Sequence, residues 1–395
     1  MYNVILKRNE EKRILNFHPW IYANEVSKIT GKDAQGSICK VLSFEGKIIG
    51  YGYINHASKI IVRMLELTNE ERCESDYNYD YFYNLIDKAN KFRLSLGYDN
   101  SYRVIFSESD KLPGLIVDKY DQYLSCQFLT LGMEIRKQMI IDILVKIFNP
   151  IGIYERSDVS AREKEGLKEV KGVLYGIVKD KVVIKENGLL INVDIINGQK
   201  TGYFLDQQLN RLKIKHYCKN AKVLDCFCNV GGFSLSASLN GAKSVTSLDI
   251  SPLAIEEVKQ NALLNKLNNI HPECQDVFKA LRDYKEQNEK FDLIILDPPA
   301  FTKSADTVKE GYKGYLDINT LALKIINDGG YLVTCSCSNH LTLNLFLKMI
   351  EEAALRAKRR IKLVDLSFQG KDHASLIAMS EALYLKVAYL KVEAN

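Results

Sequence analysis

The sequence predicts an α/β protein whose C-terminal half forms a doubly wound parallel sheet. The first observation is the stretch from Val223 to Asp249, which reads as a strand, a turn with two glycines, a helix and a second strand. The second is that nearly continuous apolar strands alternate with helical segments up to residue 338. Such strands are buried on both faces, because helices cover both sides of a parallel sheet. The third is that these strands end on polar residues, which line the ligand-binding crevice in this class of sheet.

Length and composition are those of a multidomain protein with substantial cores. The 395 residues are 46% hydrophobic, and this length favours two or three domains. The formal net charge of +5 is compatible with a polyanionic partner but is also ordinary for a globular protein. No apolar run is long enough to span a membrane, and the charged amino terminus lacks the apolar core of a signal peptide. We therefore expect a cytoplasmic protein without a membrane partner, whose nine scattered cysteines are free thiols.

The N-terminal region, residues 1–72, is expected to be a small β-rich domain. Three strand-like segments are separated by polar turns, at 37–43, 47–54 and 60–66. Basic residues are interleaved here with aromatic ones, including the only tryptophan, Trp20. This mixture suits RNA, whose bases stack on aromatic rings and whose phosphates meet cations. A solvated basic surface over an aromatic core explains the same composition equally well.

Residues 73–190 are expected to form a central α+β domain. Its boundary is marked by an acidic, tyrosine-rich segment at 70–83, and its pattern contains no obvious chemistry. The polar run at 155–158 is better explained as a loop capped by its own Ser and Asp than as a ligand site. The doubly wound domain is then expected over residues 191–395. It begins with a glycine turn and a helix, residues 200–217, which either lie over a cofactor or simply precede the first strand.

The polar strand ends predict a site for an adenosine-bearing cofactor. Four strands end on Asp225, Asp249, Asp297 and the turn from Cys335 to Ser338, and Asp276 follows a fifth strand. The glycine loop matches neither the dinucleotide fingerprint nor a phosphate-binding loop, because the glycine spacing differs and no Lys-Ser or Lys-Thr follows. A cofactor without phosphates is therefore favoured, namely S-adenosylmethionine.

Each part of this cofactor has an expected partner. Asp249 would bind the ribose hydroxyls, as the second strand-end carboxylate does in nucleotide-binding folds. Asp276 would face the adenine amino group, although a role as a turn former is equally compatible. The backbone near Gly231 would lie against the amino-acid tail, because glycine allows close approach of a ligand.

The Asp-Pro-Pro sequence at 297–299 predicts a rigid wall beside the transferable methyl group. Two prolines fix the backbone, so Pro298 and Pro299 are expected to hold a planar base. Phe301 is expected to stack on this base, and Asp297 to accept or share a proton with its polar edge. A plain rigid turn is the alternative.

Cys337 is the expected nucleophile. Carbon 5 of a pyrimidine is a poor nucleophile, whereas addition of a thiolate to carbon 6 makes an enolate-like carbon 5 that attacks a methyl group. A thiol with a reference pKa of ~8.5 needs a neighbouring basic group or backbone N–H to ionise. Only one of Cys335 and Cys337 is expected to face the substrate, with Cys335 pointing to the opposite face. The C-x-C spacing is not that of a zinc or iron–sulfur site, so no metal is expected.

With these residues in hand, the chain resembles the RlmI-like family of bacterial large-subunit ribosomal RNA cytosine-C5 methyltransferases. The likeness covers nearly the whole length and rests on His18-Pro19-Trp20, Leu112 to Leu115, Tyr154 to Asp158, Lys200 to Gln207, Gly231-Gly232, Asp297 to Phe301, and Ser336 to Ser338. The resemblance implies a PUA-type RNA-binding domain, a central domain, a Rossmann-like methyltransferase domain and often a homodimer. It also implies ribosomal RNA as the partner and Cys337, rather than Cys335, as the nucleophile.

The motifs and the resemblance together give the expected site. The catalytic residues are Cys337 and Asp297, and the base that removes the carbon-5 proton is either Asp297 or a water. The substrate contacts are Pro298, Pro299 and Phe301. The residues expected around S-adenosylmethionine are Thr201, Gly202, Phe204, Asp206, Gln207, Asp225, Asn229, Gly231, Gly232, Asp249, Ile250, Asp276, Val277 and Asp297.

Three other functions are weighed against this one. The first is a methyltransferase for an exocyclic amine or another RNA base, but amine enzymes place an aromatic residue directly after the two prolines, where this chain has Ala300. The second is a non-catalytic, ribosome-associated RNA-binding protein, which would be expected to lose Asp249 and the Gly231 loop. A dehydrogenase is disfavoured because the three-glycine fingerprint is missing.

Overall fold

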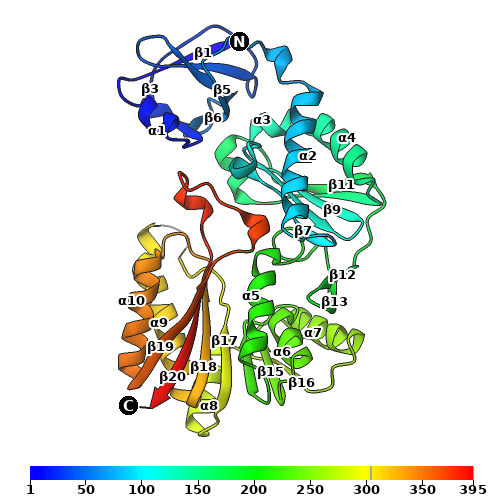
Figure 1. Cartoon of the computed structure of the whole chain (residues 1–395), viewed down its shortest axis with the longest axis vertical. Coiled ribbons are helices and arrows are strands. Elements are labelled where there is room, and N and C mark those ends of the chain that lie inside the picture. The colour runs from blue at the N-terminus through cyan, green and yellow to red at the C-terminus, as the bar shows by residue number, and fades with distance from the viewer. Residues whose placement is uncertain (303–304, 395) are drawn as a thin grey trace. The chain divides into compact units, whose positions relative to one another are not determined.

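The computed structural model of the protein describes residues 1–302 and 305–394 (Figure 1). The chain forms two compact units, and each combines segments that are far apart in the sequence. The first unit consists of residues 1–184, 193–205 and 371–382, and the second of residues 185–192, 206–370 and 383–395. Within the described part of the chain, no helix is both long and apolar enough to cross a membrane.

The first unit begins with a six-stranded sheet in the order β2-β6-β5-β4-β1-β3. Its strands pair antiparallel except β1 and β4, which are parallel. The elements are β1 Tyr2–Leu6, α1 Glu11–Leu15, β2 Trp20–Tyr22, β3 Val26–Thr30, β4 Ile38–Leu42, β5 Ile48–Ile54 and β6 Ile60–Leu67. The predicted β-rich N-terminal domain is confirmed, and its three predicted strands correspond to β4, β5 and β6.

The rest of the first unit is built on a five-stranded sheet in the order β11-β10-β9-β8-β7. Helices α2 and α4 pack against each other, and α2 buries Phe82, Ile86 and Ala89 at helical spacing. The elements are α2 Tyr79–Ser95, β7 Ser101–Phe106, β8 Leu115–Tyr120, β9 Tyr123–Phe128, α3 Leu131–Glu134, α4 Lys137–Phe148, β10 Gly152–Ser157 and β11 Val170–Gly176. Strands β12 Val182–Glu186 and β13 Leu189–Val193 form a separate two-stranded sheet.

The second unit is built on a seven-stranded sheet in the order β16-β15-β14-β17-β18-β20-β19. The first five strands are parallel, and β20 runs antiparallel to both β18 and β19. The strands are β14 Lys222–Cys226, β15 Ser244–Asp249, β16 Ile270–Cys274, β17 Phe291–Leu296, β18 Ile326–Ser336, β19 Arg359–Ser367 and β20 Lys386–Ala394. The helices are α5 Gln208–Lys213, α6 Gly232–Leu239, α7 Pro252–Leu264, α8 Val277–Glu286, α9 Val308–Ile325 and α10 Leu343–Ala357.

Both faces of this sheet are buried, as the apolar strands predict. Successive residues of β17 illustrate this, because Ile294 packs into one core cluster and Leu293 into another. The first cluster contains residues of α8, α9 and α10, and the second contains residues of α6. Helices thus cover the two faces (Figure 1). The doubly wound α/β prediction is confirmed.

Strand β18 differs from its predicted form. The sequence predicts a helix over 316–326, then the glycines at 329–330 and a strand over 331–334, but in the structure these glycines lie inside β18. The pairing with β17 is irregular here, since Phe291 lies opposite Ile326 whereas Leu293 lies opposite Tyr331. The strand therefore contains a bulge, and Gly329 adopts the left-handed φ of 77° that such an irregularity favours.

Candidate active site

The site is built at the carboxyl edge of four adjacent parallel strands, β15, β14, β17 and β18. The register places Cys226 opposite both Leu248 and Leu296, and Leu296 opposite Thr334. The residues directly before and after these positions therefore lie at one edge of the sheet. In this way the structure brings together Asp225, Asp249, Asp297 and the Cys335 to Ser338 turn.

Asp225 is a fully buried carboxyl group with one uncommitted oxygen. Its Oδ2 accepts a hydrogen bond of 2.6 Å from the Ser234 hydroxyl. Its Oδ1 is buried and has no hydrogen-bond partner among the described residues. Burial raises the pKa of Asp225 to about 7, and the negative charges of Asp297 and Asp249 act in the same direction. A buried acceptor without a partner fits a bound ligand that donates a hydrogen bond here.

The glycine loop has the conformation that a closely approaching ligand requires. Gly231 has a φ of 88°, in the left-handed region, and precedes the first residue of α6, Gly232. A Cβ at Gly231 would lie 3.1 Å from the Val258 side chain. The first backbone N–H groups of α6 have no partner within the helix and favour negative charge. This geometry fits the carboxylate of the amino-acid tail of S-adenosylmethionine.

Asp249 is oriented by the backbone around it. Its Oδ2 accepts from Asn229 N at 3.0 Å and its Oδ1 from Ser251 N at 2.9 Å. Each carboxylate oxygen has a further lone pair that can accept from a hydroxyl group, so the fit to a ribose diol is good. The next residue, Ile250, is 69% exposed, which leaves apolar surface beside the carboxylate for an adenine ring.

Asp276 and Val277 have clear structural roles. Asp276 caps α8, because its Oδ1 accepts from Lys279 N at 2.9 Å. The alternative role as a local cap is therefore present in the structure. The Val277 side chain packs in the hydrophobic core, so only its backbone is available to a cofactor.

In the segment before β14, two side-chain amides form a chain of hydrogen bonds that ends on Asp297. Asn210 donates to Gln207 Oε1 at 2.8 Å, and Gln207 Nε2 donates to Asp297 Oδ1 at 3.0 Å. Asp206 accepts from the Tyr384 hydroxyl and from Gly370 N. Gln207 is thus fixed with its amide facing the Asp297 carboxylate.

The other residues expected from this segment belong to the first unit. The Thr201 hydroxyl hydrogen-bonds Asp118, and the Phe204 ring lies 4.5 Å from Lys200 Nζ. Gly202 has a φ of 137°, and a Cβ there would lie 3.2 Å from Asp194 O. Contact of Thr201, Gly202 and Phe204 with the cofactor stays a prediction.

The Asp-Pro-Pro wall is supported by an aromatic cluster. Pro298 is buried and Pro299 is exposed. The half-buried Phe301 ring packs at centroid distances of 4.7, 6.0 and 6.4 Å against Tyr315, Phe278 and Phe227, respectively. Much of Phe301 is therefore used to hold the wall in place, and the stacking of its remaining surface on a base stays a prediction.

The two cysteines at the end of β18 differ in depth. Cys335 lies within the strand and is fully buried, which raises the pKa of its thiol well above the ordinary value. Cys337 follows the last strand residue and is half-buried. The expectation that Cys335 points to the opposite face is wrong, because residues two apart on a strand share a face and both cysteines pack against the same core cluster. The strand end at Ser336 separates them.

Lys386 is a site residue that the sequence reasoning missed. It lies on β20 opposite Ser336, is 4% exposed, and donates to Ser338 O at 2.7 Å. Burial lowers the pKa of Lys386 to about 8, while the negative charge of Cys337 acts in the opposite direction. The only sequence signal was a lysine near the start of an otherwise apolar run, residues 385–390. Its ammonium group is placed to favour the thiolate form of Cys337.

No group of three or more His, Cys, Asp or Glu side chains that could hold a metal ion is found among the described residues.

Comparisons with known proteins identify an N-terminal domain and a C-terminal domain of the chain. Residues 4–67 match the PUA-like domain, and residues 171–366 match the S-adenosylmethionine-dependent methyltransferase family. Ribosomal RNA large subunit methyltransferase I of Vibrio campbellii is 40% identical over 397 residues, which cover 98% of this chain and 99% of that protein. The protein of the same name from Tolumonas auensis is 40% identical and covers 97% of both chains.

Solved structures show the same fold. A candidate S-adenosylmethionine-dependent methyltransferase from Streptococcus mutans superimposes with a TM-score of 0.83 at 22% identity, over 99% of this chain and 100% of that one. A candidate methyltransferase solved with S-adenosylhomocysteine gives a TM-score of 0.84 at 21% identity, also over 99% and 100%. The family of the chain follows from its near full-length relatives and from the matched methyltransferase domain. The strand-end site fits this assignment. The chain belongs to the ribosomal RNA large subunit methyltransferase I family and is an S-adenosylmethionine-dependent methyltransferase with an N-terminal PUA-like domain.

Proposed function

We propose that this enzyme methylates carbon 5 of a cytosine in large-subunit ribosomal RNA, with Cys337 adding to carbon 6 of the base. The substrate class is that named for its relatives, ribosomal RNA of the large subunit. The proposal for carbon 5 rests on one observation. A half-buried cysteine follows the last residue of β18, at the same sheet edge as Asp225, Asp249 and Asp297, and a buried lysine lies next to it.

Cys337 has the environment of an activated nucleophile. The Lys386 ammonium favours its ionised form, since an opposite charge nearby lowers the pKa of a thiol. The following residue is held firmly, because Ser338 Oγ lies 3.0 Å from the Tyr315 hydroxyl and Ser338 O accepts from Lys386. The thiolate is thereby kept at the end of β18.

The proposed reaction requires a nucleophile, a methyl donor and a base, each in its own step. The Cys337 sulfur forms a bond to carbon 6, and the electron pair of the 5,6 double bond moves toward carbon 5. Bound S-adenosylmethionine supplies the methyl group, which carbon 5 accepts. A base then removes the carbon-5 proton, and the bond between sulfur and carbon 6 breaks as the double bond re-forms. Pro298 and Pro299 would hold the ring plane during these steps.

The base for the carbon-5 proton is either Asp297 or a water next to it. Gln207 donates to Asp297 Oδ1, which fixes the orientation of that carboxylate. A homodimer and a cytoplasmic location stay predictions.

The decisive experiment replaces Cys337 with alanine. Ribosomal RNA from cells without the gene is incubated with S-adenosylmethionine and either the wild-type enzyme or the variant, and modified nucleosides are mapped by mass spectrometry. We expect 5-methylcytosine with the wild-type enzyme and a rate loss of roughly 10³-fold or more with Cys337→Ala, as for removal of a nucleophile. Binding of S-adenosylmethionine, measured by calorimetry, should be retained.

Cys335→Ala is the matched control, because it removes a thiol two residues away that is buried in the core. It should methylate at close to the wild-type rate. Full activity of Cys337→Ala, or a methyl group on an exocyclic amine of the product, would exclude the carbon-5 mechanism. Absence of any methylated ribosomal RNA nucleoside would exclude the proposed substrate.

A further inference from the structure

A cavity of about 580 Å³ lies within the first unit, between the N-terminal sheet and the central domain. Its N-terminal wall consists of Trp20, the β5–β6 turn and Arg63 of β6. The central domain contributes residues 107–108, Gly114, residues 129–130, Ala161 and residues 163–165. The volume is within the range of about 300–1,000 Å³ that is typical of small-ligand sites. None of the residues assigned above to methyl transfer is among those that line it.

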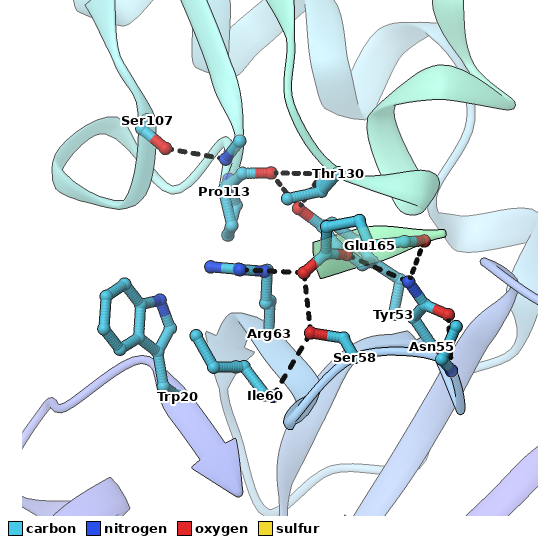
Figure 2. Close-up of polar contacts among 12 residues, drawn as sticks. Trp20, Tyr53, Asn55, Ser58, Ile60, Arg63, Ser107, Pro113, Thr130 and Glu165 are labelled. Atoms are coloured by element: carbon cyan, nitrogen blue, oxygen red, sulfur yellow. Dashed lines mark hydrogen bonds and ion pairs between the residues drawn. The ribbon is translucent and has the colours of Figure 1, made fainter. Parts of the chain in front are cut away.

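The floor of the cavity is an ion-pair network with surplus negative charge. Arg63 donates to Glu108 at 2.7 Å and to Glu165 at 2.9 Å (Figure 2 shows the second contact). Glu165 also accepts from Ser58 at 2.7 Å and from Asn55 at 3.0 Å. The Arg63 and Glu side chains are at most 12% exposed. Two carboxylates thus face one guanidinium group in a desolvated place.

One hydrogen-bond donor at the floor of the cavity has no acceptor among the described residues. Arg63 Nε is buried and has no hydrogen-bond partner among the described residues. A buried donor without an acceptor is costly, so an acceptor supplied by a ligand would stabilise it. Next to it, Trp20 is oriented by a 2.8 Å hydrogen bond from its Nε1 to Glu108. Figure 2 shows the indole ring beside Arg63, whose guanidinium carbon lies 5.4 Å from the ring centroid.

The rim of the cavity has a different charge pattern from the floor. Lys59 and Lys164 are exposed there, and the described residues include no ion-pair partner for either. Among the described residues that line the cavity, Glu163 is the other charged residue at the rim. A phosphate group would be repelled by the acidic floor and attracted by the two lysines. A nucleotide would therefore enter with its base inward and its phosphate outward.

We propose that this cavity binds one unstacked nucleotide of a single-stranded RNA segment. The base packs on Trp20, its exocyclic amino group donates to Glu108 or Glu165, and a ring nitrogen accepts from Arg63 Nε. Lys59 and Lys164 bind the flanking phosphates. Aromatic stacking combined with cations at the backbone is how proteins hold single strands. The choice of RNA as the source of the nucleotide rests on the proposed function, whereas the site itself is separate from the methyl-transfer site.

A comparison of cytosine with uracil distinguishes recognition by these hydrogen bonds from stacking alone. Cytosine has an exocyclic amino group next to a ring nitrogen that accepts, which matches the floor. Uracil has a carbonyl oxygen in place of the amino group, and this oxygen would face the carboxylates. Oligocytidylate is therefore expected to bind at least several-fold more tightly than oligouridylate.

The only tryptophan of the chain reports directly on this site. The full-length protein is titrated with six-nucleotide oligocytidylate and oligouridylate, and Trp20 fluorescence is followed. We expect saturable quenching, stronger at a given concentration with oligocytidylate. In Lys59→Gln/Lys164→Gln, the affinity should fall and the slope of log affinity against log salt should decrease by about 0.7 for each of the two lost phosphate contacts.

Lys28→Gln/Lys32→Gln is the matched control. It removes the same charge from exposed lysines of the first unit that do not line the cavity. Its quenching curve should match that of the wild-type protein. Ala161→Leu is a second test, because it fills the rim without changing any charge, and it should weaken binding at least tenfold with an unchanged melting temperature.

Two results would overturn the proposal. One is binding of a labelled oligonucleotide, detected by anisotropy, that leaves Trp20 fluorescence unchanged. The other is an equal effect of the rim and control lysine pairs. Either result could occur while Cys337 still methylates ribosomal RNA, so failure of the cavity proposal is distinguishable from failure of the proposed function.

Discussion

Lys386 is the residue that we expect to favour the charged form of the proposed nucleophile. A buried ammonium group is costly, and its lowered pKa of about 8 expresses that cost. The protein keeps the lysine where Ser338 O and the Cys337 thiol are its neighbours. The simplest physical reason is that the ammonium group and the thiolate stabilise each other when both are charged.

Lys386→Met tests this pairing at the level of one residue. The change removes the charge and keeps an unbranched side chain, so the apparent pKa of Cys337 should rise by about one unit or more. Alkylation of Cys337 by iodoacetamide at neutral pH should then slow about tenfold. The rate is followed at the Cys337 peptide by mass spectrometry, with the exposed Cys73 and Cys274 as internal references.

The pH dependence follows from the pKa of Lys386. Below about pH 8 the wild-type lysine is charged and the variant should react more slowly. Above that pH the lysine loses its proton, and the two rates should converge. Lys391→Met, on the same strand, is the control and should leave the profile unchanged. Identical profiles for Lys386→Met and the wild-type protein would show that the lysine does not act on the thiol.

The site residues that could be predicted from the sequence are those at the ends of the parallel strands. Asp249 and Asp297 were found because each directly ends or follows an apolar strand, and parallel strands bring such ends to one edge. Lys386 was not found, because it reaches the site through an antiparallel strand added next to β18. The depth of Cys335 was also not predictable, since it depends on where β18 ends and what packs over it.

Helix α9 holds the Asp-Pro-Pro wall through a close contact at one glycine. A Cβ at Gly311 would lie 2.1 Å from Thr302 Cγ2 and 2.9 Å from Phe301 O. Three residues later, a Cβ at Gly314 would lie 3.1 Å from the Phe301 ring. The helix thus has one position without room for a methyl group and one with a tight but adjustable neighbour.

Gly311→Ala should destabilise the second unit and displace the wall. Alanine is favoured over glycine within a helix by about 1 kcal/mol, but overpacking against backbone costs about 1–3 kcal/mol or more. We expect a lower midpoint in urea and a lower rate of methyl transfer, with binding of S-adenosylmethionine little changed. Gly314→Ala is the matched control and should be near neutral. Equal stability of the two variants would show that the contact at Gly311 relaxes freely.

The elements that were predicted correctly carry strong local signals. The apolar run at 291–296 predicts a strand with the bounds of β17, and the capping Ser251 followed by Pro252 predicts the start of α7. Strand β11 was missed because most of its residues are exposed and show no apolar periodicity. The elements after residue 338, α10, β19 and β20, were not predicted from their own pattern. The glycines of β18 were misassigned because a bulge and a helix end favour the same residue.

At the scale of the whole molecule, contacts between distant segments define the two units. Residues 371–382 belong to the first unit, where Arg93 donates to Asp372 O at 2.9 Å and Arg103 N donates to Asp372 Oδ2 at 2.9 Å. These partners are more than 260 residues apart in the sequence. No local pattern reveals such a pairing, so the sequence could predict the classes of the domains but not how the units share the chain.

Arg63 joins the N-terminal sheet to the central domain by electrostatics. Trp20 and Arg63, from the sheet, meet Glu108 and Glu165 of the central domain. Arg63→Met leaves both buried carboxylates without their countercharge, and breaking a buried pair in this way costs about 3–5 kcal/mol. We expect unfolding of the first unit in urea, followed by Trp20 fluorescence, to move to lower urea concentration by a corresponding amount.

Arg72→Met is the control for the loss of a cation. Arg72 pairs with Glu70 at 2.7 Å, but both side chains are more than one third exposed. Such exposed pairs contribute at most about 1 kcal/mol, because water solvates the partner that remains. Adding Glu165→Gln to Arg63→Met removes one of the two stranded charges and should restore part of the lost stability. A loss in Arg63→Met no larger than that in Arg72→Met would mean that packing, rather than this ion-pair network, joins the two domains.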